Sequence, residues 1–488
     1  MCLYLLVHMS FTTTTYYKLA IILFLFVAIT IISSSIRLQL LGANVDEKEI
    51  VKPGTKKELD KVFYQEKVEK VDSIVKSITS KNHFNGNILV AYKGNIIFKE
   101  SFGFADLNKK EKLTTESVFQ LASLSKQFTA MAIMILKEQG KISYEDSVTK
   151  YIPELPYKGI TIRMLLNHTS GLPNYMWLTE NYWKEKQAPY NEDIIDMLED
   201  LKTPLYFTSG RRFDYSNTGY VLLASIVERV THKRFSSFME EEIFIPLGME
   251  NTFVYSSSFR TRKDKLNGFG YRGKRYRIID ETINDGTVGD KGVYSTLDDL
   301  FKWDQALYAN VLVSEGTMNE ALSGFKLRNK YDIPYGFGFR VTKRNDKKLV
   351  YHHGRWNGFR TSIYRFVEDS NTIIVLNHTS TSLNGTIMNN IEKVFTDSTS
   401  TDHTQDVIAT IIDSGLENGI KKYYNYKSSG QALLDTVKLN KASAILTNGK
   451  NSELAEKIKL FKSMYVQGEL DTNFMDEKYF LKSLSLAK

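Results

Sequence analysis

Ser123 and Lys126 are a nucleophile and a base whose spacing allows one to act on the other. Residues three positions apart in a helix share a face, so the lysine amine can approach the serine hydroxyl. A serine hydroxyl is a poor nucleophile until a neighbouring base takes its proton. At a helix N-terminus, unpaired N–H groups and the positive end of the dipole would also stabilise an oxyanion. The pair therefore predicts a serine acyl-transfer site.

The residues that follow distinguish this pair from other Ser-x-x-Lys patterns. Residues 127–136 have almost no polar face, which indicates a helix buried on all sides, and Gly140 is a suitable helix stop. A reactive serine at the tip of a buried helix has a rigid support. The same pattern lacks that support where it begins at Ser73, Ser147, Ser323 and Ser485.

Two downstream segments carry residues that could complete the site, Tyr215-Ser-Asn217 and His352-His-Gly354. The charge of the lysine would favour the phenolate form of a neighbouring tyrosine. Tyr215 is therefore a candidate base for the serine and a candidate acid for the leaving group. Gly354 has no side chain and would let a substrate approach an edge strand closely.

Further segments accompany these motifs, in a fixed order, within residues 83–398. Together they resemble the serine β-lactamase-like family. That family includes class C β-lactamases, low-molecular-mass penicillin-binding proteins that are D-alanyl-D-alanine carboxypeptidases, and related esterases. The segments that carry the resemblance are Gly103–Leu107, Phe119–Ser123, Thr161–Pro173, Phe213–Tyr220, Pro246–Met249, Gly292–Thr296 and His352–Phe359.

The resemblance implies a role for each catalytic motif. Ser123 would attack a carbonyl carbon and form an acyl-enzyme, with Lys126 and Tyr215 as the other catalytic residues. The backbone N–H groups of Ser123 and Arg355 would form the oxyanion hole. The guanidinium of Arg355 or Arg360 would match a carboxylate on the substrate.

The resemblance also implies substrate contacts and exposes two departures from the family pattern. Asn217 would contact the substrate amide and the lysine. His352, in the substrate-binding motif with Gly354, stands where typical β-lactamases have the lysine of Lys-Thr-Gly, although several peptidase and esterase relatives also have histidine there. That change disfavours an efficient β-lactamase and favours a peptidase or an esterase. Asp290-Lys291 stand where relatives often have small residues, which would alter access to the cleft.

These features predict a serine hydrolase that acts on a D-alanine-type peptide, a β-lactam or a small ester. The alternative, from another class, is a membrane-tethered penicillin-binding or sensing protein that uses the fold without turnover. No cofactor is expected. No metal is expected either, because His352-His353 has no third ligand at a suitable spacing and no His-Glu-x-x-His pattern occurs. His168 is expected to be structural.

Composition limits the partners. The chain has 488 residues and a formal net charge of +8, which is a mild bias for this length. It has no Lys/Arg run with interleaved aromatic residues, so nucleic acid is not an expected partner. Cys2 is the only cysteine, which rules out an internal disulfide. The expected partners are a small-molecule or peptide substrate and, at the N-terminus, a membrane.

Residues 1–45 contain an uncharged apolar run at 19–36, flanked by Lys18 and Arg37. The run is just long enough to span a bilayer. The small residues at 33–35 would also suit a signal-peptide cleavage site. The segment is either a cleaved signal peptide or an anchor, and both interpretations place the rest of the chain in the periplasm or cell envelope.

The remaining pattern predicts an α/β (α+β) protein. Residues 46–82 are charged and helix-prone, and they would form a spacer and a lead-in helix before a hydrolase domain at 83–398. Strands from both ends of that domain would pair in one antiparallel sheet, flanked by helices and by a mostly helical middle subdomain. The expected strands lie at 86–92, 96–102, 336–341, 349–351, 359–366 and 372–376.

Residues 399–488 are expected to form a short helical extension after a linker at 398–402. Helical patterns at 439–446 and 454–461 resemble one tetratricopeptide-like hairpin, fewer than the three or more repeats that a stable solenoid needs. The extension is either a packing appendage or a module that docks a protein partner.

Overall fold

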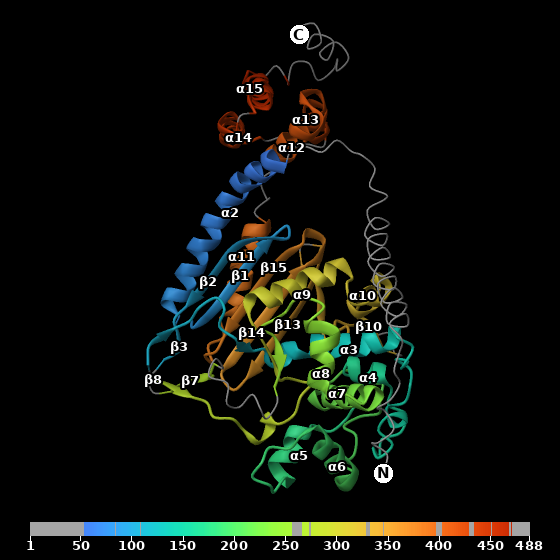
Figure 1. Cartoon of the computed structure of the whole chain (residues 1–488). Coiled ribbons are helices and arrows are strands. Elements are labelled where there is room, and N and C mark those ends of the chain that lie inside the picture. The colour runs from blue at the N-terminus through green and yellow to red at the C-terminus, as the bar shows by residue number, and fades with distance from the viewer. Residues whose placement is uncertain are drawn as a thin grey trace, which may run out of the picture. The chain divides into compact units, whose positions relative to one another are not determined.

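The computed structural model describes residues 53–82, 84–107, 109–255, 266–272, 275–327, 332–344, 346–396, 403–428, 434–449, 451–467 and 470 (Figure 1). The chain divides into two compact units, one formed by residues 61–405 with 425–435 and the other by the remaining residues. The apolar run at 19–36 and the linker at 398–402 lie outside the described residues. Within the described ranges, no helix is both long and apolar enough to cross a membrane.

Within the described residues of the larger unit, six strands form an antiparallel sheet in the order β12-β13-β14-β15-β1-β2. β15 pairs with β1, with Val375 opposite Ile88, and so joins the two ends of the region. The predicted sheet, built from both ends around a helical middle, is confirmed. The strands are β1 (Gly86–Tyr92), β2 (Asn95–Phe102), β12 (Arg340–Arg344), β13 (Lys347–Trp356), β14 (Phe359–Phe366) and β15 (Asn371–Asn377).

Two-residue turns close two hairpins of this sheet. Lys93 and Gly94 connect β1 to β2 with φ angles of 50° and 74°, the left-handed conformation that such turns require. Asn357 and Gly358 connect β13 to β14 in the same way, with φ angles of 38° and 89°.

The strand predicted at 336–341 is wrong in extent, because β12 begins only at Arg340. Gly338 has a φ of 76°, and a Cβ atom there would lie 2.6 Å from the carbonyl oxygen of Lys126. Residues 336–339 therefore form a turn that packs against the helix carrying that lysine. The alternating sequence pattern does not reveal this close approach.

The two faces of the sheet pack against different helices (Figure 1). Side chains alternate between the faces along each strand. One face packs against α2 (Pro53–Lys81) and α11 (Asn384–Thr396), in a core that includes Val71, Val75, Ile88, Val90, Val375, Ile387 and Ile391. The other face packs against the helical middle, in a core that includes Leu89, Ile363, Ile374 and Leu376.

The helical middle is centred on α3 (Ser125–Glu138), whose residues 125–136 are all buried, and on α7 (Asn217–Thr231). The other helices are α4 (Ile162–Leu166), α5 (Tyr175–Tyr182), α6 (Asn191–Leu201), α8 (Phe235–Met239), α9 (Leu297–Ala309) and α10 (Glu315–Ala321). Short strands outside the main sheet are β3 (Phe104–Asp106), β4 (Glu111–Lys112), β5 (Phe119–Gln120), β6 (Phe253–Val254), β7 (Phe269–Arg272), β8 (Arg275–Ile278), β9 (Val293–Ser295), β10 (Phe325–Lys326) and β11 (Asp332–Ile333).

The predicted helical extension is confirmed in α12 (Thr404–Ser414), α13 (Leu416–Ser428), α14 (Thr436–Asn448) and α15 (Ser452–Val466). In the smaller unit, α14 and α15 follow each other closely and bury Leu439, Ala442, Leu446, Ala455, Ile458 and Phe461. A role for this hairpin in docking a partner stays a prediction.

Candidate active site

Ser123 lies in a tight turn between β5 and α3. The turn is a 3₁₀ segment at Ala122–Leu124, so the serine precedes the α-helix instead of lying in its first turn. Ala122 has a φ of 51°, a left-handed conformation that residues other than glycine rarely adopt and that is often found at functional sites. Leu121 holds the turn, since its N–H donates to Val293 and its carbonyl accepts from the Thr361 hydroxyl at 2.6 Å.

Lys126 is fully buried beside the serine. Its Nζ lies 3.2 Å from the Ser123 hydroxyl oxygen, 2.8 Å from Oδ1 of Asn217 and 2.7 Å from the backbone carbonyl oxygen of Asp290. Burial lowers the pKa of Lys126 to about 8; the charge of Arg340 also lowers it, and that of Asp290 opposes the shift. The neutral form of this amine, which can accept a proton, is therefore a minor but substantial fraction near physiological pH and the main form above about pH 8.

Tyr215 also lies close, with its ring centre 4.9 Å from Nζ of Lys126. Its hydroxyl is buried and makes no hydrogen bond with any described residue. Burial raises the pKa of Tyr215, and the nearby Ser123 and Arg340 only partly offset that effect. The predicted depression of this pKa is therefore wrong, because the sequence argument included the lysine charge but not the loss of water around the phenol.

His168 supports the segment that carries Tyr215. Its Nδ1 accepts the backbone N–H of Ser216 at 3.1 Å, and its ring centre lies 4.3 Å from that of Tyr215. The side chain is completely buried, and burial together with the charge of Lys126 holds its pKa well below the usual value. His168 is therefore a neutral group that packs behind the tyrosine.

His352 is also neutral and has both ring nitrogens engaged. Its Nδ1 donates to the carbonyl oxygen of His353 at 2.8 Å, and its Nε2 accepts from the Tyr335 hydroxyl at 3.0 Å. Burial and the charges of Lys126 and Arg340 hold the pKa of His352 well below its usual value. The histidine therefore does not replace the charge of the family lysine. Tyr335, which fixes its orientation, lies outside all of the sequence motifs.

Gly354 has a packing role that the sequence pattern did not reveal, and its predicted role in the approach of a substrate stays a prediction. A Cβ atom at this position would lie 2.2 Å from the carbonyl oxygen of Leu121 and 2.2 Å from the hydroxyl oxygen of Thr361. The glycine therefore lets β13 approach the turn that carries the nucleophile. This approach brings the backbone of Arg355 toward Ser123.

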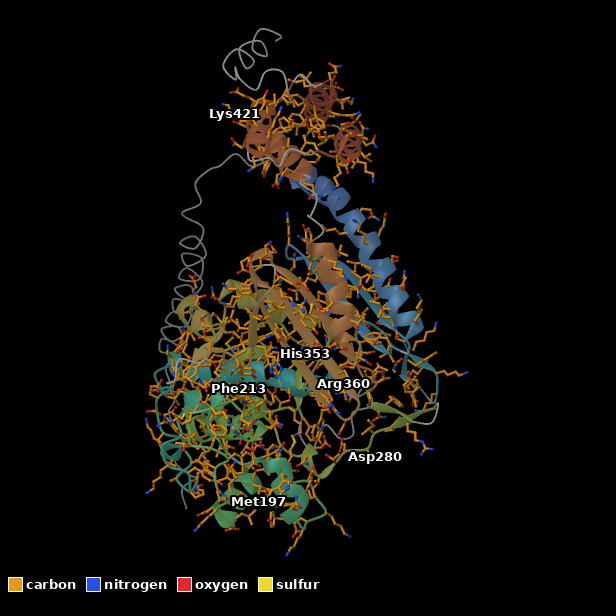
Figure 2. All side chains as sticks on the ribbon, turned by 180° about the vertical axis from the view of Figure 1, so that it is seen from behind. Met197, Phe213, Asp280, His353, Arg360 and Lys421 are labelled. Atoms are coloured by element: carbon orange, nitrogen blue, oxygen red, sulfur yellow. The ribbon has the colours of Figure 1, made fainter. Side chains whose placement is uncertain are left out.

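The side chains of Arg355 and Arg360 lie on the wrong face of the sheet to meet a substrate carboxylate. The two residues are opposite each other in the pairing of β13 with β14. Because neighbours along a strand alternate, Arg355 points away from the face on which Gly354 meets the nucleophile turn. His353 and Arg360, labelled in Figure 2, share this outer face. The carboxylate-binding role predicted for these guanidinium groups is therefore not supported, while the predicted role of the Arg355 backbone N–H is unaffected.

Arg340, which no sequence motif indicated, supplies a cation beside Tyr215. Its guanidinium carbon lies 5.6 Å from the ring centre of Tyr215 and 5.9 Å from that of Tyr335. The side chain is half-buried, and it forms no salt bridge with any residue that the structure describes. Arg340 is paired with Tyr351, which by strand alternation shares a face with His353 and Arg355, so the strand pairing gives no signal that would have revealed the position of the guanidinium.

Asp290 and Lys291 form a buried pair that supports the site. Nζ of Lys291 donates to the Tyr175 hydroxyl at 2.6 Å and to the Thr287 hydroxyl at 2.7 Å, and lies 3.5 Å from Oδ1 of Asp290. The backbone carbonyl of Asp290 is one of the acceptors for Lys126. These bulky side chains are thus packed beside α5, and the backbone of Asp290 helps to position Lys126.

Known proteins resemble this chain in sequence. The family model for Beta-lactamase matches residues 71–391. Penicillin-binding protein 4* of Bacillus subtilis (strain 168) is 38% identical over 327 residues, which are 64% of this chain and 72% of that protein. D-aminopeptidase of Brucella anthropi is 26% identical, over 60% of this chain and 55% of that protein.

Solved structures show the same fold. The octameric penicillin-binding protein homologue from Pyrococcus abyssi superimposes with a TM-score of 0.59 at 24% identity, over 68% of this chain and 77% of that one. Since the family model covers most of the sequence, the chain belongs to the β-lactamase family of serine hydrolases.

Proposed function

We propose that the protein is an exported serine hydrolase that cleaves an amide or ester through an acyl-enzyme on Ser123. The observation that carries this proposal is the environment of the Lys126 amine. Two of its three neighbours, Oδ1 of Asn217 and the carbonyl oxygen of Asp290, can only accept hydrogen bonds. A neutral amine has two N–H groups for these acceptors, and its lone pair then faces the Ser123 hydroxyl at 3.2 Å.

The mechanism follows from this arrangement. Lys126 takes the hydroxyl proton while Ser123 attacks the substrate carbonyl carbon. The N–H groups of Ser123 and Arg355 stabilise the oxyanion. Tyr215 stays a phenol because burial raises its pKa, and it donates a proton to the leaving group. The proton held by Lys126 then passes to the Tyr215 phenolate, which restores both groups. Water attacks the ester carbonyl while Lys126 takes its proton, and that proton returns to the Ser123 oxygen as the acid product leaves.

The preferred substrate is a peptide of the D-alanine type with a carboxylate at its end. β12 pairs with residues 347–351 of β13, so residues 352–356 have a backbone edge along which an extended peptide can lie. Arg340 lies at the start of this stretch and would bind the carboxylate. The names of the relatives, a penicillin-binding protein and a D-aminopeptidase, agree with an amide substrate. The neutral His352 disfavours rapid β-lactam hydrolysis.

The direct test compares Ser123→Ala with wild type in the purified full-length chain. A fluorescent penicillin should label the wild type covalently, and a chromogenic ester or an acyl-D-alanyl-D-alanine peptide should be hydrolysed. Ser123→Ala should lose both activities. Ser323→Ala is the matched control, because Ser323 also begins a Ser-x-x-Lys pattern but is exposed near the end of α10. Turnover at the wild-type rate in Ser123→Ala would refute the assignment of the nucleophile.

Export is proposed from the apolar run at 19–36. The test uses cells whose outer envelope has been opened while the cytoplasmic membrane stays intact. Protease added to these cells should degrade the domain at 83–398. Complete protection, with a cytoplasmic marker equally protected, would contradict export.

A further inference from the structure

The irregular segment at 287–292 connects the proposed base to the turn that carries the nucleophile. Asp290 lies in this segment, and its carbonyl oxygen accepts a hydrogen bond from Nζ of Lys126 at 2.7 Å. Val293 follows the segment, and its carbonyl oxygen accepts the N–H of Leu121 at 2.8 Å. The position of the segment therefore fixes one acceptor of the base and one support of the nucleophile turn.

The segment depends on other parts of the chain for its position. Gly289 and Gly292 have φ angles of 101° and 97°, which residues with a side chain rarely adopt. A Cβ atom at Gly289 would lie 2.4 Å from the carbonyl oxygen of Tyr220 and 2.7 Å from Cβ of Ala224, so the segment packs directly on α7. Because irregular backbone has no ladder of hydrogen bonds of its own, side chains from elsewhere must bind its polar groups.

Helix α3 binds the backbone of this region at two points besides Lys126. The Thr129 hydroxyl donates to the carbonyl oxygen of Gly289 at 2.7 Å, and the Ser125 hydroxyl oxygen accepts the N–H of Val293 at 3.0 Å. Both side chains are fully buried, and both belong to the beginning of the helix that carries the lysine. The base and the backbone that binds it are therefore attached to the same rigid element.

Asn191 binds the segment from a third helix. It is the first residue of α6 and is only 6% exposed. Its Oδ1 accepts the N–H of Val288 at 2.9 Å, and its Nδ2 donates to the carbonyl oxygen of Val288 at 3.1 Å and to that of Val221 in α7 at 3.3 Å. A carboxamide has a donor and an acceptor side by side, so it matches both backbone groups of one residue. Asn191 thus joins α7 to the segment, two residues before Asp290.

We propose that Asn191 is a positioning residue for the base. Among the described residues it makes no hydrogen bond with Ser123 or Lys126, so it acts through the backbone that it holds. By fixing Val288 it keeps the Asp290 carbonyl in place, and that carbonyl orients the neutral Lys126 amine with its lone pair toward Ser123. The inference rests on the proposed function, in which Lys126 is the base.

The test measures acylation of the full-length chain by a fluorescent penicillin over a range of penicillin concentrations. In Asn191→Leu the maximal acylation rate should fall by roughly 10- to 100-fold, since a misplacement of about 1 Å far from the chemistry can cost about 10²-fold. The concentration that gives half of the maximal rate should not change, because the Asp290 carbonyl binds the base and not the penicillin. The amount of protein labelled at the end point counts the active molecules, so partial unfolding does not enter the rate.

Thr129→Val tests the same segment from α3. The substitution keeps the shape of the side chain and removes only the hydroxyl that binds the carbonyl oxygen of Gly289. The maximal acylation rate should again fall while the half-saturating concentration of penicillin stays the same. This variant also covers the case in which Asn191→Leu does not fold, because it introduces no larger side chain into the core.

Asn384→Leu is the matched control. Asn384 is also the first residue of a helix, α11, and is 7% exposed. Its Nδ2 donates to the carbonyl oxygen of Arg360 at 3.2 Å and to the Ser362 hydroxyl at 2.9 Å, so it binds β14 and not the segment at 287–292. The control should lower the melting temperature but leave the maximal acylation rate of the active molecules at the wild-type value.

The possible failures are distinguishable. A maximal rate at the wild-type level in either Asn191→Leu or Thr129→Val, or an equal fall in Asn384→Leu, would overturn the positioning role and leave the serine hydrolase in place. A change in the half-saturating concentration alone would overturn it as well. A wild type that is neither labelled by penicillin nor active on the chromogenic ester or the peptide would overturn the proposed function and the inference with it.

Discussion

The two sides of the proposed catalytic centre differ in how completely their polar atoms are paired. On the α3 side, Nζ of Lys126 has three hydrogen-bonding neighbours. On the Tyr215 side, the phenolic hydroxyl is buried without a partner among the described residues. Since unpaired buried polar atoms are rare in folded proteins, the second side is the one that a substrate is expected to complete. One side therefore fixes the base, while the other is left open for the reacting groups.

The largest effect is expected on the paired side. Lys126→Met keeps the length of the side chain but removes the base, and acylation should slow toward the upper end of the roughly 10²–10⁴-fold range typical of acid–base groups. Stopped-flow acylation by a fluorescent penicillin measures this rate. Lys326→Met, in the Ser-x-x-Lys pattern that begins at Ser323, should leave it unchanged. A rate near wild type in Lys126→Met would remove the lysine from the role of base.

A smaller effect is expected on the unpaired side. Tyr215→Phe removes only a hydroxyl, and acylation should slow toward the lower end of the same roughly 10²–10⁴-fold range. The melting temperature should not fall, because the lost hydroxyl has no partner in the folded protein. Tyr308→Phe is a control for stability, since it removes another buried hydroxyl without a partner.

The double variant sharpens this comparison. The fold-decrease in acylation rate in Lys126→Met/Tyr215→Phe should be much smaller than the product of the fold-decreases in the two single variants, because the effects of groups that act as a unit are not additive. A larger loss in Tyr215→Phe than in Lys126→Met would move the base role from one side of the site to the other.

The pH dependence of acylation reports which side holds the base. The pKa of Lys126 is lowered to about 8, so the rate should rise as pH increases through that value and level off above it. Arg340 contributes to the lowered pKa of the lysine, so Arg340→Gln should move the rise to higher pH. The pKa of Tyr215 is raised, so titration of the phenol should not produce this rise in the acylation rate near pH 8. A pH-independent rate between pH 6 and 9, roughly one to two units either side of the lysine pKa, would contradict the assignment.

The lowered pKa of Lys126 also makes the stability of the folded protein depend on pH. Between about pH 8 and the ordinary lysine pKa of 10.5, the unfolded chain keeps a proton on Lys126 that the folded protein has released. The free energy of unfolding should therefore rise with pH across that window, and the rise should be smaller in Lys126→Met. Urea titrations at the two ends of the window measure the difference.

The smallest expected effect is on KM. It is tested by comparing substitutions of two arginines, Arg340 and Arg355. Arg340→Ala should raise KM for a peptide with a C-terminal carboxylate by about tenfold, the scale of a hydrogen bond to a charged group. It should change KM for the C-terminal amide of the same peptide much less. Arg355→Ala should affect neither, because its side chain lies on the outer face of the sheet and its backbone N–H is retained. Equal changes for acid and amide would remove Arg340 from carboxylate recognition.

Local pattern was sufficient to predict the scaffold. The apolar residues after Lys126 predicted a buried helix, and α3 is buried along 125–136. Alternation and turn residues predicted strands at both ends of the domain, and β1 pairs with β15. These features depend on short-range periodicity and on turns such as Lys93-Gly94, which a sequence displays directly.

The features of the site that could not be predicted from the sequence depend on burial and on the register between distant strands. The direction of the Tyr215 pKa shift follows from loss of water, which no motif encodes. The approach of Gly354 to Leu121 and the arrival of Arg340 beside the site both depend on how β13 docks against distant segments. The assignment of Arg355 and Arg360 to a substrate failed for the same reason, since the face of a strand is known only once its register is known.

The position of Trp356 has a practical consequence. Its indole is held by Asp285 on one edge and covered by the Lys291 amine on one face, and both of these residues line a cavity of about 450 Å³. The fluorescence of an indole responds to the charges around it, so a charged group that enters this cavity should change the emission of the ring. The protein therefore carries an intrinsic optical reporter of that cavity, and a Trp356→Phe variant would isolate its signal from those of the other tryptophans.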